Sequence, residues 1–174
     1  MSATPRIATL SAAEAEAALD ALSDILVDCV AGGASVSFML PFGLDDARRY
    51  WRRIVGDVAQ GDRALFGAAL DGRLVGTAQL GLAGPPNQTH RADIAKLLVH
   101  RSARGRGLAR ALMTAAEAEA KARGRTLLTM DTASGTAERL YLDLGYVRVG
   151  VIPGYARLPD GPLCDTTVFY KQLG

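Results

Sequence analysis

One segment, residues 96–110, constrains the fold more than any other part of the chain. It reads KLLVHRSARGRGLAR, an apolar run that passes into a loop of arginine and glycine and then into a helical pattern. A strand followed at once by such a loop and a helix leaves unpaired backbone N–H groups at the helix N-terminus, where the helix dipole adds partial positive charge. The segment therefore predicts a strand–loop–helix unit that can seat a phosphate or pyrophosphate group.

The surroundings of this loop carry more information than its short motif. The pattern R-x-x-G-x-A begins at Arg104, and the same pattern begins again at Arg73. The second match falls inside a predicted strand with no helix after it, so it offers no free helix amides and we expect no phosphate there. The alternative for the first match is an ordinary glycine-rich turn with solvated arginines. Its strand and helix favour phosphate binding.

Hydrophobic periodicity and turn residues predict seven strands and four helices. The strands are expected over residues 5–10, 63–70, 74–82, 92–100, 126–131, 146–152 and 166–173, and the helices over 12–31, 45–60, 106–123 and 134–144. Strands alternate with helices only in the second half of the chain. This order predicts an α/β chain with a mixed sheet that contains a parallel portion, not a fully doubly wound sheet.

The composition sets limits on the partners. The chain has 174 residues and a net charge of +2, from 20 basic and 18 acidic side chains. This length fits a single domain over residues 1–174, and this balance argues against nucleic acid or an anionic membrane as partner. Cys29 and Cys164 belong to no Cys/His cluster, so we expect no metal site. No leader or membrane-spanning segment is recognisable, which predicts a soluble protein of the cytoplasm.

Two segments in the right order resemble the motifs of the GNAT acyltransferase superfamily. Residues 99–110 are similar to its acetyl-CoA motif, and residues 137–146 (AERLYLDLGY) are similar to its second motif, a helix that carries a tyrosine and ends in Gly-aromatic. More narrowly, residues 32–39, 96–99 and 153–155 resemble the tabtoxin-resistance acetyltransferase group. The resemblance implies a mostly antiparallel sheet of about seven strands with one splayed parallel pair, flanked by four helices.

The resemblance also implies roles in binding acetyl-CoA. Backbone groups of Leu97, Leu98 and Val99 would pair with the pantetheine arm, and the Val99 amide would polarise the thioester carbonyl. Ser134 stands where many members have an asparagine that contacts the cofactor arm, and we expect it to serve mainly as a helix N-cap. The pyrophosphate would be held by the loop amides and by charge-assisted contacts of the arginines, from Arg104, Gly105, Arg106, Gly107, Leu108, Ala109 and Arg110.

Acylation of an amine needs a proton acceptor for the amine and an acid for the leaving thiolate. Tyr141 is the candidate acid, with simple core packing as the alternative. Asp93 and Asp131 are the candidate bases, because each lies on one of two neighbouring predicted strands. For both carboxylates the alternative is a strand-end cap or an ion pair, with Arg91 or Arg125 as partner. His90 and His100 are weaker candidates.

The loop over residues 35–42, together with Tyr155, is the candidate wall of the acceptor pocket. We expect Ser35, Phe38, Met39, Asp93, Asp131 and Tyr155 to contact the acceptor. The alternative is that Phe38, Met39 and Phe42 only cover the core.

These observations favour an acetyl-CoA-dependent N-acetyltransferase that acts on a small-molecule primary amine, for example an amino-acid-like toxin or antibiotic in a resistance role. No cysteine or serine has the setting of an activated nucleophile, so direct transfer is expected. A peptide or protein amine as acceptor, and a non-catalytic acyl-CoA sensor, remain the alternatives. We expect a monomer or a homodimer.

Overall fold

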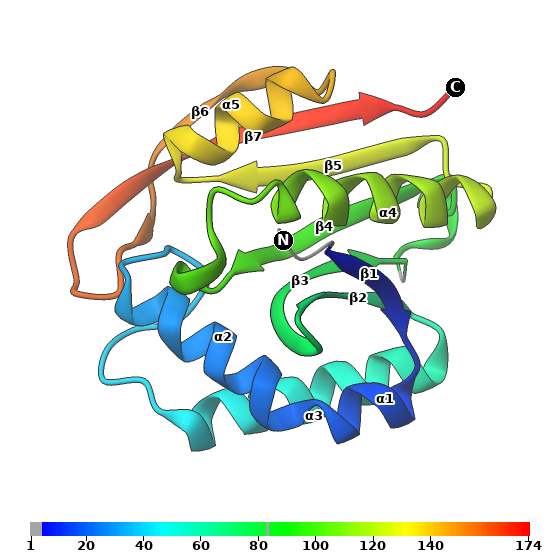
Figure 1. Cartoon of the computed structure of the whole chain (residues 1–174). Helices are drawn as coiled ribbons and strands as arrows, with labels where there is room; N and C mark the ends of the chain where they lie inside the picture. Colours follow the sequence, from blue (N-terminus) through cyan, green and yellow to red (C-terminus); the bar gives the residue numbers. More distant parts are fainter. Residues whose placement is uncertain (1–4, 83) are drawn as a thin grey trace.

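The computed structural model describes residues 5–82 and 84–174, and it places one seven-stranded sheet between two layers of helices (Figure 1). The strand order is β1-β2-β3-β4-β5-β7-β6. The strands are β1 (Arg6–Leu10), β2 (Arg63–Leu70), β3 (Arg73–Gly81), β4 (Arg91–Val99), β5 (Leu127–Thr132), β6 (Val147–Arg157) and β7 (Leu163–Gln172). All seven correspond to predicted strands, and Arg73 lies in β3 as expected.

Five α-helices flank the sheet, one more than predicted. They are α1 (Ala12–Ala17), α2 (Leu19–Ala31), α3 (Leu44–Gln60), α4 (Leu108–Ala122) and α5 (Gly135–Asp143). The additional helix arises because the expected helix over residues 12–31 is divided at Ala18, whose backbone (φ −92°, ψ 8°) leaves the helical region. Ala15 and Leu19, on either side of this break, are buried in the same core. None of the described helices is both long and apolar enough to cross a membrane.

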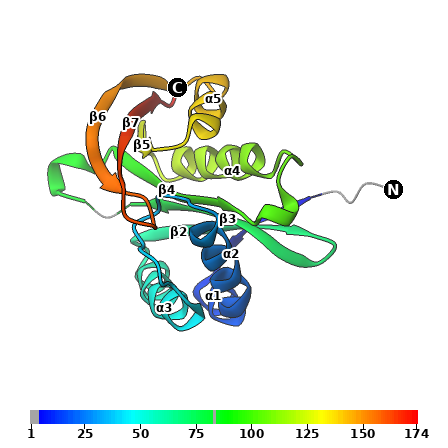
Figure 2. The same cartoon turned by 90° about the vertical axis from the view of Figure 1, so that its left-hand side faces the viewer.

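Each face of the sheet has its own core, because successive strand residues point to opposite faces. On one face α4 and α5 cover Phe66 and Phe169, and on the other α1, α2 and α3 cover Leu65 (Figure 2). Trp51 of α3 and Leu112 of α4 are fully buried in these two layers. Leu65 and Phe66 are neighbours in β2, so the two cores share the strand that separates them.

The only parallel pairing among the described strands is between β4 and β5, and it is short. It extends from Arg91 opposite Leu127 to Asp93 opposite Thr129. Beyond these residues β4 and β5 no longer pair with each other. From there on β4 pairs only with β3, and β5 pairs only with β7. The expected splayed parallel pair is therefore confirmed.

The last hairpin is longer than predicted. The last two strands were expected to end at Ile152 and to begin at Thr166, respectively. In the structure β6 continues to Arg157 and β7 starts at Leu163. The register shifts between Ile152 and Ala156, which lets the strand pass through the Pro-Gly-Tyr segment. Gly154 takes a positive φ of 59° there, and its amide donates to Asp165 Oδ1 at 2.8 Å.

Candidate active site

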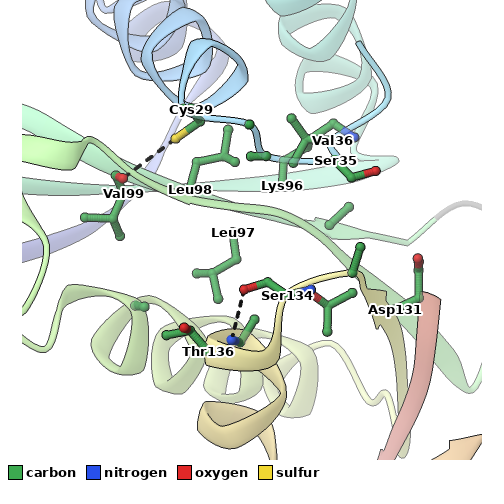
Figure 3. A pocket seen from close by; sticks show the side chains of 18 of the residues that line it. Cys29, Ser35, Val36, Lys96, Leu97, Leu98, Val99, Asp131, Ser134 and Thr136 are labelled. Carbon is green, nitrogen blue, oxygen red and sulfur yellow. Dashed lines mark hydrogen bonds between the residues drawn. The ribbon is translucent and has the colours of Figure 1, made fainter. Parts of the chain in front are cut away.

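The gap between the diverging ends of β4 and β5 opens a cavity of about 1150 Å³ (Figure 3). Its lining comes from segments far apart in the chain, namely residues 94–99, 103–110, 131–141, 32–39, 155–158 and 165–166 with Cys29, each contributing some of its side chains. The strands approach from one side, α4 and α5 present their N-terminal ends, and the loop between α2 and α3 closes the other side. The cavity is thus built where the sheet lacks pairing.

The free edge of β4 forms one wall. Leu98 pairs with Thr77 and Val99 with Gly76 on the β3 side, and Leu97, Leu98 and Val99 all line the cavity. No described strand pairs with β4 on the β5 side after Asp93. An extended ligand chain can therefore add to this edge as a further strand would.

The N-terminus of α4 forms a second wall and has no side-chain cap. The first helical hydrogen bond joins the Ala111 amide to the Gly107 carbonyl, so the amides of residues 108–110 precede it. Gly105 and Gly107 both have φ of 75°, and a Cβ at either would meet open space. Glycine allows this left-handed backbone without strain, and it explains why the helix starts at Leu108 and not at residue 106 as predicted.

Two other helices, α1 and α5, have side-chain caps at their N-termini. Ser11 and Glu14 form a capping box on α1, and Ser134 Oγ accepts from the Ala137 amide at 3.4 Å on α5. Ser134 is thus an N-cap, as expected, and it also lines the cavity. The first turn of α4 has neither a cap nor an acidic residue, which leaves its positive end available to an anion.

Two of the three loop arginines reach the cavity. Arg104 and Arg110 line it, whereas Arg106 is absent from the lining. Arg104 Nε donates to the Val99 carbonyl at 3.1 Å, and Arg110 pairs with Asp143 at 3.3 Å on the exposed side of α5. These two arginines place positive charge beside the uncapped amides.

Tyr141 of α5 projects from the opposite wall. Its side chain is buried, packed against Phe169 and Tyr146 with ring centroids 5.6 and 5.9 Å away, and it lines the cavity. Its hydroxyl makes no hydrogen bond within the described part of the chain. Burial, together with the charge of Asp131, raises the pKa of Tyr141 to about 12. The phenol therefore stays protonated at neutral pH and has a proton to give.

The two candidate carboxylates occupy different places. Asp131 lines the cavity, and its Oδ2 accepts from Thr166 Oγ1 at 2.6 Å. Asp93 lies outside the lining, at the last position of β4 that pairs with β5. There it forms an ion pair with Arg91 at 2.6 Å and accepts a hydrogen bond from Thr129 Oγ1, which is the ion-pair alternative considered for it. The structure thus brings Asp131, but not Asp93, to Tyr141.

The expected acceptor wall also lines the cavity. Ser35, Phe38, Met39 and Tyr155 all contribute to it. Ser35 Oγ donates to the Arg157 carbonyl at 3.3 Å, and the Leu40 amide donates to the Pro159 carbonyl at 2.9 Å. These bonds join the loop after α2 to the β6–β7 hairpin and enclose that side of the cavity.

Neither histidine contributes to the lining. His100 Nδ1 lies 2.8 Å from Ser102 Oγ, and its Nε2 faces Asp28 at 3.6 Å on the outer side of the loop after β4. His90 precedes β4, where its carbonyl accepts from Thr126. Neither histidine is therefore placed to contact a molecule in the cavity.

Lys96 is the main cavity residue to which the sequence analysis assigned no role. Its side chain lies on the Ser35–Val36 side of β4, whereas Leu97 faces Ser134 (Figure 3). A signal was available, because this lysine interrupts an apolar strand. Cys29 also reaches the cavity, where it is a buried free thiol.

Comparison with known proteins agrees with this geometry. Residues 21–146 match the acetyltransferase (GNAT) family. The chain belongs to the GNAT family. It is 36% identical over 112 residues to an uncharacterised N-acetyltransferase from the hisH-hisA intergenic region of Azospirillum brasilense, a match that covers 63% of this chain and 65% of that relative's length.

Solved GNAT structures share the fold across nearly the whole chain. An N-acetyltransferase from Staphylococcus aureus Mu50 has a TM-score of 0.81 at 21% identity, covering 98% of this chain and 99% of that one. A phosphinothricin acetyltransferase from Sinorhizobium meliloti, solved in complex with AcCoA, has a TM-score of 0.77 at 20% identity, covering 100% and 90%. The seven-stranded mixed sheet is thus the GNAT fold.

The GNAT chain has the features that acetyl-CoA requires. The uncapped α4 amides and Arg104 suit a pyrophosphate, the free edge of β4 suits an amide-bearing arm, and the cavity extends between them. The open space above Gly105 and Gly107 leaves room for phosphate oxygens to approach the backbone closely. The residues present therefore fit this cosubstrate.

Proposed function

We propose that this GNAT protein transfers an acetyl group from acetyl-CoA directly to the primary amine of a small molecule. One observation carries the proposal: a single cavity joins an uncapped helix N-terminus, an unpaired strand edge and the tyrosine Tyr141. The helix N-terminus can bind an anion, the strand edge can bind an extended arm, and Tyr141 can donate a proton, all within the same cavity. The thioester of bound acetyl-CoA supplies the electrophilic carbonyl carbon.

Residues on three elements would hold acetyl-CoA. The amides of residues 105–110 and the guanidiniums of Arg104 and Arg110 bind the pyrophosphate, and Leu97 and Leu98 hold the arm through their backbone groups. The Val99 amide polarises the thioester carbonyl. Arg106 has a smaller part in this proposal than the sequence analysis gave it, since its side chain does not reach the cavity.

Tyr141 is the proposed general acid. Its Oη donates a proton to the departing sulfur, so that CoA leaves as a thiol. The raised pKa fits this role, because the phenol is fully protonated over the physiological range. Burial and the charge of Asp131 disfavour the phenolate that donation leaves behind, so Tyr141 must regain a proton once the thiol has formed.

Asp131 is the proposed partner of the acceptor amine. Its carboxylate faces the cavity and can attract the acceptor's ammonium group and accept its proton, directly or through water. Thr166 fixes one carboxylate oxygen at 2.6 Å and leaves the other free. Asp93 is given no catalytic part here, because Arg91 and Thr129 engage it at a position outside the cavity.

Direct transfer is supported by the state of the cavity thiol. Burial raises the pKa of Cys29, and its Sγ lies 3.7 Å from the Val99 carbonyl oxygen. A thiol in this environment stays protonated and is a poor nucleophile. A covalent acetyl-cysteine step is therefore not part of the proposal.

A small acceptor is favoured over a peptide because the segments on the acceptor side of the cavity are joined to each other. The bonds from Ser35 and Leu40 connect the loop after α2 to the β6–β7 hairpin and so restrict the space between these segments. Membership of the tabtoxin-resistance group, and a role in toxin or antibiotic resistance, extend the proposal and rest on the resemblance of residues 32–39 and 153–155. A cytoplasmic setting fits the two free thiols, Cys29 and Cys164.

A thiol-release assay with acetyl-CoA tests the proposal. The panel contains amino acids, dipeptides, aminoglycosides and polyamines, and at least one small amine is expected to release CoA. Release with peptides alone would favour the peptide acetyltransferase alternative. Tight acetyl-CoA binding without turnover of any amine, and without any effect of Tyr141→Phe, would identify a non-catalytic acyl-CoA sensor.

A further inference from the structure

Lys96 has an unusual backbone position. The pairing of β3 with β4 shifts between Thr77 and Gln79, so that Lys96 and Leu97 together stand opposite Ala78. Lys96 adopts a left-handed φ of 50° in this bulge. Side-chain-bearing residues rarely take such a backbone, and where they do the strain is commonly associated with a functional site.

The partner of Lys96 has the same peculiarity. Lys96 Nζ donates to Ser37 Oγ at 3.1 Å, and Ser37 itself has a φ of 80°. Among the described residues other than glycine, only these two and Asp71 have a positive φ, and Asp71 lies in the tight β2–β3 turn, which explains its backbone. The two unexplained strained residues thus contact each other, and both line the cavity.

The ammonium group of Lys96 is held by neutral groups only. The rings of Phe38 and Tyr50 lie 5.9 and 6.0 Å from Nζ, at cation–π distance, and Ser37 accepts one hydrogen bond. Within the described part of the chain no carboxylate lies within 4.0 Å of Nζ. A lysine has three N–H donors, so two remain for a ligand. Burial accordingly lowers the pKa of Lys96.

A negative charge lies across the same cavity. Asp131 on β5 also lines the cavity, and its charge raises the pKa of Lys96 in opposition to burial, although no ion pair joins the two side chains. The cavity lining therefore contains a positive and a negative group that do not neutralise each other by direct contact. A molecule that carries both an ammonium and a carboxylate group complements this pair.

We infer that Lys96 binds a carboxylate of the acceptor, and that the acceptor is therefore an amino acid or a close analogue whose amine faces Asp131. Two hydrogen bonds from Nζ to the carboxylate would complete the coordination of the ammonium. The strained bulge at Lys96 serves to aim the side chain at the acceptor side of β4, while Leu97 remains on the cofactor side. This inference rests on the proposed function and specifies its substrate class.

The test compares L-amino acids with their α-carboxamides as acceptors, because the amide keeps the size and removes the negative charge. Wild-type protein should acetylate at least one acid with kcat/KM about ten- to hundredfold above its amide, the range expected for one charge-assisted contact. Lys96→Met should remove this preference, mainly through KM. Lys96→Arg should retain most of it, and Lys121→Met, which removes a lysine from α4 outside the cavity, should leave it unchanged.

Equal rates for acids and amides with the wild type would overturn the inference, as would an equal loss on both acceptors in Lys96→Met. Circular dichroism melts exclude unfolding of the variants. If no acceptor releases thiol, the proposed function fails, and calorimetric titration of the same acids into CoA-saturated protein still decides the role of Lys96. Binding to the wild type that is lost in Lys96→Met supports it, whereas no binding to either protein rejects it.

Discussion

The two ends of the β4–β5 pair contain similar aspartates in opposite circumstances. At the closed end Asp93 is the last residue of β4 that pairs with β5, and its side chain has Arg91 and Thr129 as partners. At the open end Asp131 lies beyond the β4–β5 pairing, beside the cavity. In this chain the aspartate on the paired part of β4 is engaged by neighbouring side chains, whereas the aspartate beyond the β4–β5 pairing faces the cavity.

The helix α4 makes the same contrast along its length. Its N-terminus lies at the open end, with the uncapped Gly107 in the cavity wall. Its C-terminus lies at the closed end, where Gly124 ends the helix and Thr126 donates to the His90 carbonyl at 2.8 Å. At the closed end the chain itself supplies the hydrogen-bond partners after α4. At the open end the first amides of α4 are left for a ligand to bind.

The largest expected effect follows from placing negative charge at the open end. Gly107→Glu should weaken acetyl-CoA binding by more than about a hundredfold, since the carboxylate would occupy and repel the anion seat. Gly124→Glu is the matched control, with φ of 69° against 75° and open space at both Cβ positions. Calorimetry should find its acetyl-CoA affinity unchanged. A similar loss in both variants would show that backbone strain, not the phosphate seat, causes the effect.

The next prediction concerns the two neighbouring tyrosines. Tyr141→Phe should lower kcat by about 10²–10⁴-fold without changing acetyl-CoA affinity, because it removes the proton donor for the leaving sulfur. Tyr146→Phe removes a buried hydroxyl that lies outside the cavity lining, and kcat should be unchanged. Steady-state kinetics on the best acceptor measure both. Normal turnover by Tyr141→Phe would leave Tyr141 with a packing role only.

The aspartates themselves give the most direct test of the comparison. Asp131→Asn should lower kcat/KM by about a hundredfold, because it removes the charge that holds the amine and accepts its proton. Asp93→Asn should leave kcat/KM within about twofold and lower the free energy of unfolding by about 0.5–1 kcal/mol, the value of an exposed ion pair. If Asp93→Asn lowered kcat/KM more than Asp131→Asn, the reacting groups would lie at the closed end of the β4–β5 pair and the assignment of the site would be wrong.

The strands and their order along the chain could be predicted from the sequence, because local signals determine them. Alternating or continuous apolar runs marked each strand, and the Asp71-Gly72 turn marked the β2–β3 hairpin. The break at Ala18 had no such signal, since neither glycine nor proline occurs there. The extension of β6 to Arg157 was also missed, because Pro153 and Gly154 are residues typical of a turn and fall inside this strand.

The site was accessible only in part. The strand–loop–helix unit around Gly107 is local, so the sequence indicated the anion seat. The difference between Asp93 and Asp131 is not local, because it depends on the residue at which β4 and β5 stop pairing. No pattern within β4 alone specifies that residue, because it depends on how β5 is placed against β4 by the rest of the fold.

At the open end β4 and β5 are not joined by backbone hydrogen bonds, so side-chain contacts hold the segments there. Asp28 of α2 makes one such contact. It accepts from the Arg101 amide and from Arg101 Nε, both at 2.8 Å, and so fixes the start of the cofactor loop. Burial alone would raise the pKa of Asp28, but these bonds outweigh it and hold the pKa below its ordinary value of 3.8. A carboxyl with a lowered pKa stabilises the fold above about pH 4, and this contribution is lost as the pH falls through the folded-state pKa.

Asp28→Asn should therefore lower the free energy of unfolding by about 1–3 kcal/mol at pH 7, the cost of a hydrogen-bonded charge, with a smaller difference from wild type below pH 4. Urea unfolding at several pH values measures this. Asp24→Asn is the control, because Asp24 is 65% exposed and lies 3.7 Å from His100, and it should change stability by less than about 0.5 kcal/mol. A difference for Asp28→Asn that did not vary with pH would mean that the side chain acts by packing, and the open end would then be held by shape and not by charge.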